Sequence, residues 1–183
     1  MGNNKHILFI QGAGDDGYEE DAKLVDALQG ELGSVYKIHF PHLHSDENLS
    51  DFGWLKQISN EIVSIDDDVI LVAHSLGASM LLKCLSENQI AEKILGIFLM
   101  ATPFWEGDEE WVQGLKLKAD FADELPKNVP VFLYHCRDDE EVPFDHLELY
   151  KKKMPHAIVR EIESGGHQLK NDLSIVAKDI QLL

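Results

Sequence analysis

The sequence predicts an α/β fold, namely a three-layer α/β/α sandwich around a mainly parallel six-stranded sheet. Six short apolar runs alternate with segments of helical periodicity along the 183 residues, which is the pattern of a parallel α/β sheet. Most of these runs are continuously apolar, as is typical of strands buried on both faces. At this length we expect a single domain, residues 1–183.

The expected strands are, in chain order, 6–11, 35–40, 69–74, 94–101, 131–136 and 157–163. The helices between them carry apolar residues at spacings of three and four, which share one buried face. These helices and their apolar residues are 18–32 with Ala22, Val25, Leu28 and Leu32, 51–64 with Phe52, Leu55, Ile58 and Ile62, 144–154 with Phe144, Leu147 and Tyr150, and a C-terminal helix with Leu173, Val176, Ile180 and Leu183. Residues 79–85 are apolar nearly all round, so we expect that helix to be central.

Residues 103–128 fit this alternation less well, because large apolar residues are scattered there among many charges. We expect one helix that both crosses over between strands and forms a small helical flap above the strand ends. No larger cap is expected, so the fold is compact.

Composition and charge restrict the class of partner. The net charge of −17 argues against nucleic acid and against an anionic membrane surface. No run approaches the roughly 18 apolar residues of a membrane span. The first residues lack the apolar core of a signal peptide, and Cys84 and Cys136 suit a reducing compartment. We therefore expect a cytoplasmic protein, monomeric or a small homo-oligomer, that binds a small molecule.

Polar residues follow four of the expected strands, at the edge where parallel strands place their carboxyl ends and their binding sites. The four stretches are QGAGDDG after the first strand, Ser75 after the third, HCRDDEEVP after the fifth and SGGHQ after the sixth. One serine, several acids and one histidine thus reach one edge, in the chain order serine, acid, histidine.

These residue types together indicate nucleophilic catalysis. A serine hydroxyl is a poor nucleophile until a base such as histidine takes its proton, and a carboxylate fixes the histidine tautomer. Ser75 stands between a strand end and a helix start, in the sequence AHSLGA. A sharp turn there exposes its hydroxyl and places the N–H of Leu76 at a helix N-terminus, where negative charge is favoured.

With these motifs the sequence resembles the α/β-hydrolase superfamily over nearly its whole length, and is most similar to the small, lidless serine hydrolases of the retinoblastoma-binding-protein type. AHSLGA resembles the nucleophile elbow, QGAGDDG the oxyanion loop, HCRDDEEVP the acid loop and SGGHQL the histidine loop. The resemblance implies a triad of Ser75, Asp139 and His167. It also implies an oxyanion hole formed by the backbone N–H groups of Ala13 and Leu76. No cofactor and no metal is implied.

Two positions depart from the superfamily pattern. Gln11 replaces the usual histidine of the oxyanion loop, which a hydrolase tolerates because the donors there are backbone N–H groups. Ala73 replaces the first glycine of the elbow and adds one methyl group, whereas Gly77 keeps the second close approach. Both departures weaken the motif without excluding the chemistry.

Several residues have alternative interpretations. Ser75 on its own could be the N-cap of its helix. Asp138 is the rival acid, and Glu106 or Asp108 is a weaker candidate. His74 and His135 are expected to support the elbow and the acid loop. The remaining polar and sulfur-containing candidates are expected to be surface or core residues, not metal ligands or nucleophiles: His42, His44, Cys84 and Cys136.

The expected substrate is a small acyl compound. Aromatic residues near the site loops, namely Phe104, Trp105, Trp111 and Phe144, are candidates for an acyl pocket. The acidic stretches GDDGYEED, RDDEEVPFD and EGDEE favour a neutral or cationic substrate.

The sequence therefore predicts a carboxylesterase-like serine hydrolase that cleaves an ester, thioester or amide through an acyl-enzyme on Ser75. The alternative is a non-catalytic binding module on a hydrolase scaffold, since a fold does not fix a function. Retinoblastoma binding would require a Leu-x-Cys-x-Glu motif, and residues 82–86 end in serine instead.

Overall fold

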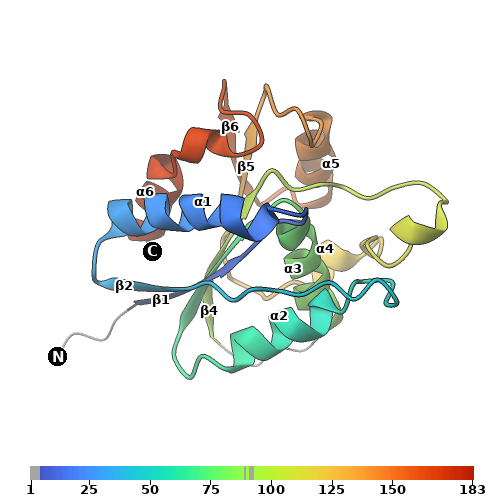
Figure 1. Cartoon of the computed structure of the whole chain (residues 1–183), viewed down its shortest axis with the longest axis horizontal. Coiled ribbons are helices and arrows are strands. Elements are labelled where there is room, and N and C mark those ends of the chain that lie inside the picture. The colour runs from blue at the N-terminus through green and yellow to red at the C-terminus, as the bar shows by residue number, and fades with distance from the viewer. Residues whose placement is uncertain (1–4, 89, 91–92) are drawn as a thin grey trace.

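A computed structural model of the protein describes residues 5–88, 90 and 93–183. A sheet of six strands forms its centre, in the order β2-β1-β3-β4-β5-β6, and each of the five pairings between these strands is parallel (Figure 1). The strands are β1 (Lys5–Ile10), β2 (Tyr36–His39), β3 (Val69–His74), β4 (Ile94–Met100), β5 (Val131–Cys136) and β6 (Ile158–Ile162). The predicted fold class is confirmed.

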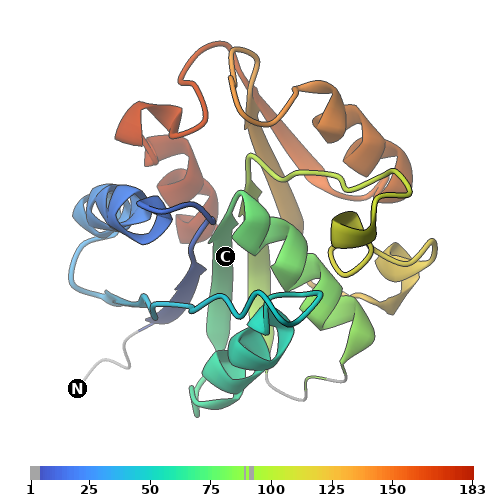
Figure 2. The same ribbon diagram turned by 45° about the vertical axis from the view of Figure 1, so that its right-hand side comes forward.

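Helices cover both faces of the sheet, as Figures 1 and 2 show. Two of them, α1 (Gly17–Leu32) and α6 (Ser174–Gln181), pack on one face. The other face is covered by α2 (Trp54–Val63), α3 (Leu76–Glu87), α4 (Phe121–Glu124) and α5 (Asp145–Lys153). Two short 3₁₀ helices, Glu110–Val112 and Leu169–Asn171, complete the secondary structure of the described residues.

The two apolar layers alternate along each strand. In β3 the side chains of Ile70 and Val72 join the α1/α6 layer, whereas Leu71 and Ala73 join the α2/α3 layer, and all four are fully buried. A central parallel strand has to be apolar on both faces, which explains its continuous apolar run. β3 ends directly before Ser75, so a fully buried strand sets the position of that residue.

The structure corrects the helix expected within 103–128. This segment is mostly loop, with only the 3₁₀ turn Glu110–Val112 and the four-residue helix α4. Gly107 breaks helical geometry in this segment, and Gly114 brings the segment close to another loop. Gly107 has a φ of 102°, and at Gly114 a β-carbon would lie 1.9 Å from the carbonyl oxygen of Ser50. The segment therefore packs directly onto the loop before α2.

Two predicted helical faces also differ from the structure. On α1 the buried side chains include Asp21 and Leu24, while Ala22 and Val25 are only half-buried. The helix predicted at 51–64 begins at Trp54, because Phe52 and Gly53 adopt left-handed conformations, with φ of 55° and 72°. Both differences place additional residues near the site described next.

Candidate active site

Ser75 occupies a strained turn between β3 and α3. Its φ and ψ are 52° and −127°, a conformation that costs a non-glycine residue of the order of 1–3 kcal/mol. Its backbone N–H donates to the carbonyl of Met100 at 2.9 Å, which anchors the turn to β4. The side chain of Ser75 makes no capping hydrogen bond to a backbone N–H of α3. The hydroxyl is thus available for another partner.

The turn depends on glycine at position 77. A β-carbon there would lie 2.1 Å from the carbonyl oxygen of Gln11, far inside contact distance. The first turn of α3 can therefore approach the loop after β1. Ala73 is fully buried and pairs with Ile10 on β1 and Leu99 on β4, so the fold accommodates the extra methyl group.

Ser75, His167 and Asp139 form a continuous hydrogen-bonded chain. The Oγ of Ser75 lies 3.0 Å from Nε2 of His167, and Nδ1 of His167 lies 3.1 Å from each carboxylate oxygen of Asp139. His167 is 3 % exposed, and the side chain of Asp139 is fully buried. The three residues follow β3, β5 and β6, so the parallel sheet brings them to one edge.

Backbone and side-chain groups hold the Asp139 carboxylate. The N–H groups of Glu141 and Val142 both donate to its Oδ1 at 2.9 Å, and Nε2 of His135 lies 3.3 Å from its Oδ2. Burial alone would raise the pKa of Asp139, but the hydrogen bonds from His135, His167 and these N–H groups lower it strongly. Asp139 is therefore ionised throughout the physiological range.

Asp138 has a different set of contacts. Its Oδ1 accepts hydrogen bonds from the N–H groups of Gly165 and Gly166, at 2.8 and 2.9 Å, and these bonds lower its pKa. It therefore ties the loop that carries His167 to the loop after β5. Of the two adjacent acids, the structure places Asp139 on the imidazole ring.

The surroundings of His167 favour its charged form. Burial lowers the pKa of His167, but the hydrogen bond to Asp139 and the negative charges of Asp139, Glu141 and Asp21 outweigh it, so the pKa is raised above 6.5. Glu141 is the exposed member of this group, with its Oε2 3.5 Å from Nε2 of His167. An imidazolium formed during a reaction would thus be stabilised.

The predicted oxyanion donors, Ala13 and Leu76, line the same cleft as Ser75. Leu76 is the first residue of α3, where a backbone N–H has no partner within the helix. The side chain of Gln11 braces the neighbouring loop, because its Oε1 accepts the N–H of Leu43 at 2.9 Å. Gln11 therefore takes a structural position beside the site.

The cleft at Ser75 has a volume of about 400 Å³. Its lining is mostly apolar and consists of Ala13, Gly14, Phe52, Ser75, Leu76, Pro103, Trp105, Trp111, Leu115, Glu141, Val142, Pro143 and His146. The indole N–H of Trp105 donates to Oγ of Ser79 on α3 at 3.0 Å, and Trp111 packs edge-on against Trp105. The apolar wall is thus fixed to the same helix as the elbow.

Two of the four predicted pocket residues lie outside the lining of this cleft. Phe104 packs edge-on against Tyr150, with ring centroids 5.0 Å apart, and Phe144 lies under the guanidinium of Arg137. Both residues were predicted to line the pocket because they are close in sequence to a site loop. Closeness in sequence does not give the direction of a side chain, and both side chains turn away from the cleft. Phe52 was missed because it was assigned to the buried face of a helix, and Glu141 because acidic loop residues are usually solvated.

A second, smaller hollow also adjoins Ser75. It has a volume of about 210 Å³ and is lined by Gly12, Ala13, Gly14, Asp16, Gly17, Glu20, Asp21, His74, Ser75, Glu141, His167 and Gln168. We call it the polar chamber and the first hollow the apolar cleft. His167 lines the polar chamber but not the apolar cleft. Another hollow, of about 360 Å³, lies beside residues 122–131 and 153–157 and includes none of the predicted site residues.

The remaining candidates lie apart from this chemistry. His42 and His44 are exposed, and their ring centroids lie 4.5 Å apart with the ring planes tilted by 36°. Among residues with described positions, no group of three or more His, Cys, Asp or Glu is arranged to hold a metal ion.

Cys84 and Cys136 are buried free thiols, and burial raises their pKa values to about 12 and about 11. Glu106 and Asp108, the weaker acid candidates, are exposed on the 103–128 segment. No helix in the described part of the chain is both long and apolar enough to cross a bilayer.

Comparisons with solved structures show the same fold. The bromoperoxidase of Bacillus anthracis is 12% identical with a TM-score of 0.72, over 99% of this chain and 92% of that one. The ydeN gene product of B. subtilis is 22% identical with a TM-score of 0.67, over 98% of each chain. A methylesterase from Arabidopsis is 16% identical with a TM-score of 0.69, over 98% of this chain and all of that one.

A search among curated protein sequences finds no match. The family model described as "Serine hydrolase" matches residues 37–173, which is well over half of the chain and includes all three hydrogen-bonded residues. The α/β-hydrolase architecture and this match agree with each other, and the chain belongs to the serine hydrolase family.

Proposed function

We propose that this serine hydrolase cleaves small carboxylic esters through an acyl-enzyme on Ser75. The observation that carries the proposal is the hydrogen-bonded chain from Oγ of Ser75 through His167 to Asp139. A capping serine would use its hydroxyl on the helix, and this hydroxyl instead meets an imidazole nitrogen.

In this mechanism the neutral His167 accepts the Ser75 proton at Nε2 while Oγ attacks the ester carbonyl. Asp139 holds the proton on Nδ1 and stabilises the imidazolium. The N–H groups of Ala13 and Leu76 receive the oxyanion. His167 then gives its proton to the leaving oxygen, and water attacks the acyl-enzyme with His167 as the base.

The two hollows suggest how an ester would lie. The leaving group has to be near Nε2 of His167, which protonates it, and His167 lines the polar chamber. The acyl chain then occupies the apolar cleft against Trp105 and Trp111. A short-to-medium apolar acyl group joined to a polar alcohol matches this arrangement.

We further propose that the substrate is neutral or cationic. Asp16, Glu20 and Glu141 all line the polar chamber, and Glu141 lies 3.5 Å from the nitrogen that handles the proton. Their combined field repels an anionic leaving group. Thioesters of coenzyme A, which carry several negative charges, are therefore expected to be poor substrates.

Hydrolysis of matched esters, thioesters and amides tests the proposal. We expect turnover of neutral esters with short-to-medium acyl chains, and its loss in Ser75→Ala. Ser86→Ala, on the same helix, is the matched control and should behave like the wild type. A protein that binds these compounds without turning any of them over would instead be a binding module on the hydrolase scaffold.

A further inference from the structure

The two acids on either side of the triad acid both bind the backbone of the histidine loop. Oδ1 of Asp138 accepts the N–H groups of Gly165 and Gly166, at 2.8 and 2.9 Å. Oε2 of Glu140 accepts the N–H of His167 at 3.1 Å. Three consecutive N–H groups of this loop therefore donate to two carboxylates of the acid loop. The mechanism above uses only the acid between these two.

Two glycines allow the histidine loop to take this shape. Gly166 has a φ of 63°, in the left-handed region, and a β-carbon there would lie 2.9 Å from Oε2 of Glu140. A β-carbon at Gly165 would lie 2.8 Å from Sγ of Cys136, the last residue of β5. Successive backbone N–H groups in a turn form a concave anion-binding site, called a nest. Here the anions that fill the nest are side chains of the same chain.

The acid loop is fixed to β5, so it can serve as an anchor. The N–H of Asp139 donates to the carbonyl oxygen of Cys136 at 3.2 Å, and Nε2 of His135 lies 2.9 Å from the carbonyl oxygen of Val142. These bonds tie the loop to the end of a strand that has neighbours on both sides. The histidine loop instead follows β6, an edge strand of the sheet. An anchored loop thus holds a loop that leaves the edge of the sheet.

We propose that Asp138 and Glu140 are positioning residues, whose carboxylates fill the nest of the histidine loop and thereby hold the imidazole of His167 against the nucleophile. Asp139 bonds that imidazole at Nδ1, while its two neighbours bond the backbone that carries it. Neither neighbour takes part in the chemical steps. The three consecutive acids thus act together on one histidine. The contacts stand on geometry alone, whereas their effect on turnover rests on the proposed function.

Hydrogen exchange at single backbone amides tests the contacts without any substrate. We expect Glu140→Ala to speed exchange most at the amide of His167, because it removes the acceptor of that N–H. Asp138→Ala should speed exchange most at the amides of Gly165 and Gly166 for the same reason. NMR measures the three amides separately. Unchanged exchange at these amides in both variants would overturn the proposal.

Steady-state kinetics on a neutral ester tests the positioning role. The double variant Asp138→Ala/Glu140→Ala should lose about 100-fold in kcat, since a displacement of about 1 Å can cost that much. KM should change little, because neither acid lines the apolar cleft or the polar chamber. Each single alanine variant should lose less, because one carboxylate still holds the loop. A double variant with the wild-type kcat, or a loss confined to KM, contradicts the proposal.

Two further variants distinguish positioning from a general effect of charge. Asp138→Asn/Glu140→Gln keeps a carbonyl oxygen at each position to accept the N–H groups, so its kcat should lie well above that of the double alanine variant. Glu163→Ala removes a carboxylate just before the histidine loop, at a side chain that is 91% exposed, and should keep the wild-type kcat. If the double amide variant is as slow as the double alanine variant, or Glu163→Ala is equally slow, charge is responsible and the proposal fails.

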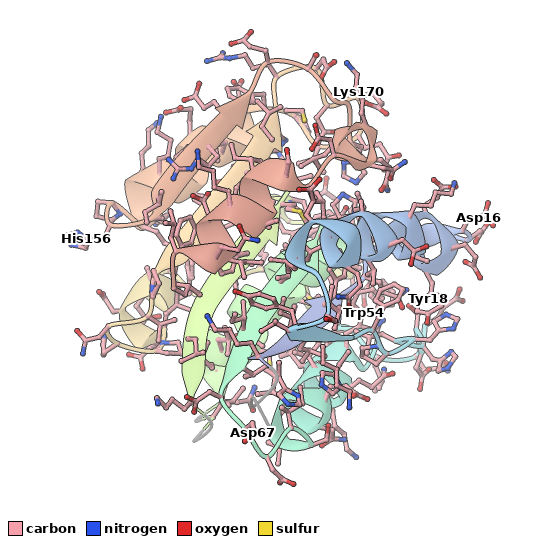
Figure 3. The ribbon with its side chains drawn as sticks, turned by 90° about the vertical axis from the view of Figure 1, so that its left-hand side faces the viewer. Asp16, Tyr18, Trp54, Asp67, His156 and Lys170 are labelled. Atoms are coloured by element: carbon pink, nitrogen blue, oxygen red, sulfur yellow. The ribbon has the colours of Figure 1, made fainter. Side chains whose placement is uncertain are left out.

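These variants should remain folded, because the carboxylates that they remove lie at the surface. Lys170, the residue directly after the histidine loop, is also exposed and stands near the outer edge of the molecule in Figure 3. We therefore expect melting temperatures close to the wild type. If the double alanine variant does not fold, the two single variants decide in its place. If the wild-type protein hydrolyses nothing, the proposed function fails, while the exchange result still decides whether the two acids hold the loop.

Discussion

At Ser75 the backbone and the side chain serve different purposes. The backbone stores the strain of a positive φ, which is offset by the β4 hydrogen bond to Met100 and by the close approach at Gly77. The side chain makes its hydrogen bond with His167, although serine is a favoured helix cap. A strained backbone whose side-chain hydroxyl leaves the helix uncapped and meets an imidazole nitrogen is typical of a nucleophilic serine.

The two adjacent acids, Asp138 and Asp139, should respond differently to the same substitution. Asp139→Asn places an amide against Nδ1 of His167, which disfavours the required tautomer, so kcat should fall by about 10⁴. Asp138→Asn weakens bonds to Gly165 and Gly166 and should affect kcat much less. Steady-state kinetics on a neutral ester measures both. The opposite order would assign the acid to Asp138.

Glu141 should set the position of the acid limb of the pH profile. His167 has to be neutral to accept the Ser75 proton, so kcat/KM rises as the pH increases through its raised pKa. Glu141→Gln removes one of the charges that raise this pKa, so the limb should move to lower pH. Glu163→Gln, which changes the net charge equally at a side chain that is 91% exposed, is the control. A shift of equal size in the control would show a general charge effect.

Within the turn around Ser75, substitutions of the two small residues Gly77 and Ala73 should differ in their effects on stability and activity. Gly77→Ala places a methyl group against the carbonyl oxygen of Gln11, so it should lower the free energy of unfolding by about 1–3 kcal/mol and distort the oxyanion loop. Ala73→Gly removes a methyl group and should leave activity within about tenfold, since one buried methylene contributes roughly 0.8 kcal/mol. Thermal melts and kcat/KM measure both effects. A stable and fully active Gly77→Ala variant would show that the close approach is dispensable.

The strands and most helices could be predicted because their signals are local. Continuous apolar runs such as β3 mark buried parallel strands, and i, i+3, i+4 spacing marks the covering helices. The segment 103–128 could not be predicted in this way. Its conformation depends on the contact of Gly114 with Ser50, which are distant in sequence.

The grouping of the site residues could be predicted from the sequence for the same reason, since each follows a strand of one parallel sheet. The direction of individual side chains could not be predicted. Phe104 and Phe144 turn away from the cleft, whereas Phe52 enters it from a loop before α2. The burial of Asp21 was overlooked because an acid in an acidic stretch is normally solvated, and His74, with which it forms a hydrogen bond, lies 53 residues away.

The charge of the whole molecule should appear in its substrate preference. The net charge of −17 and the carboxylates of the polar chamber produce a negative field at the mouth of the site. At low salt we expect kcat/KM to be lower for an anionic ester than for its neutral and cationic analogues. Salt should reduce the difference, because the Debye length falls from about 30 Å at 0.01 M to about 8 Å at 0.15 M.

Kinetics of three isosteric esters at low and high salt measures this preference. Glu141→Gln should narrow the difference between the anionic and neutral esters. Glu163→Gln changes the net charge by the same amount at an exposed position and should leave that difference nearly unchanged. Equal turnover of the anionic and neutral esters at low salt would contradict electrostatic selection.

The central claim is that Ser75 is the activated nucleophile, and covalent trapping tests it most directly. The protein is treated with a fluorophosphonate, its intact mass is measured, and the modified residue is located by peptide mapping. We predict one adduct per chain on Ser75, no adduct in Ser75→Ala, and greatly slowed labelling in His167→Ala, with a melting temperature close to the wild type in both variants. An adduct that persists in Ser75→Ala, or a folded wild-type protein that is not labelled, would contradict the account.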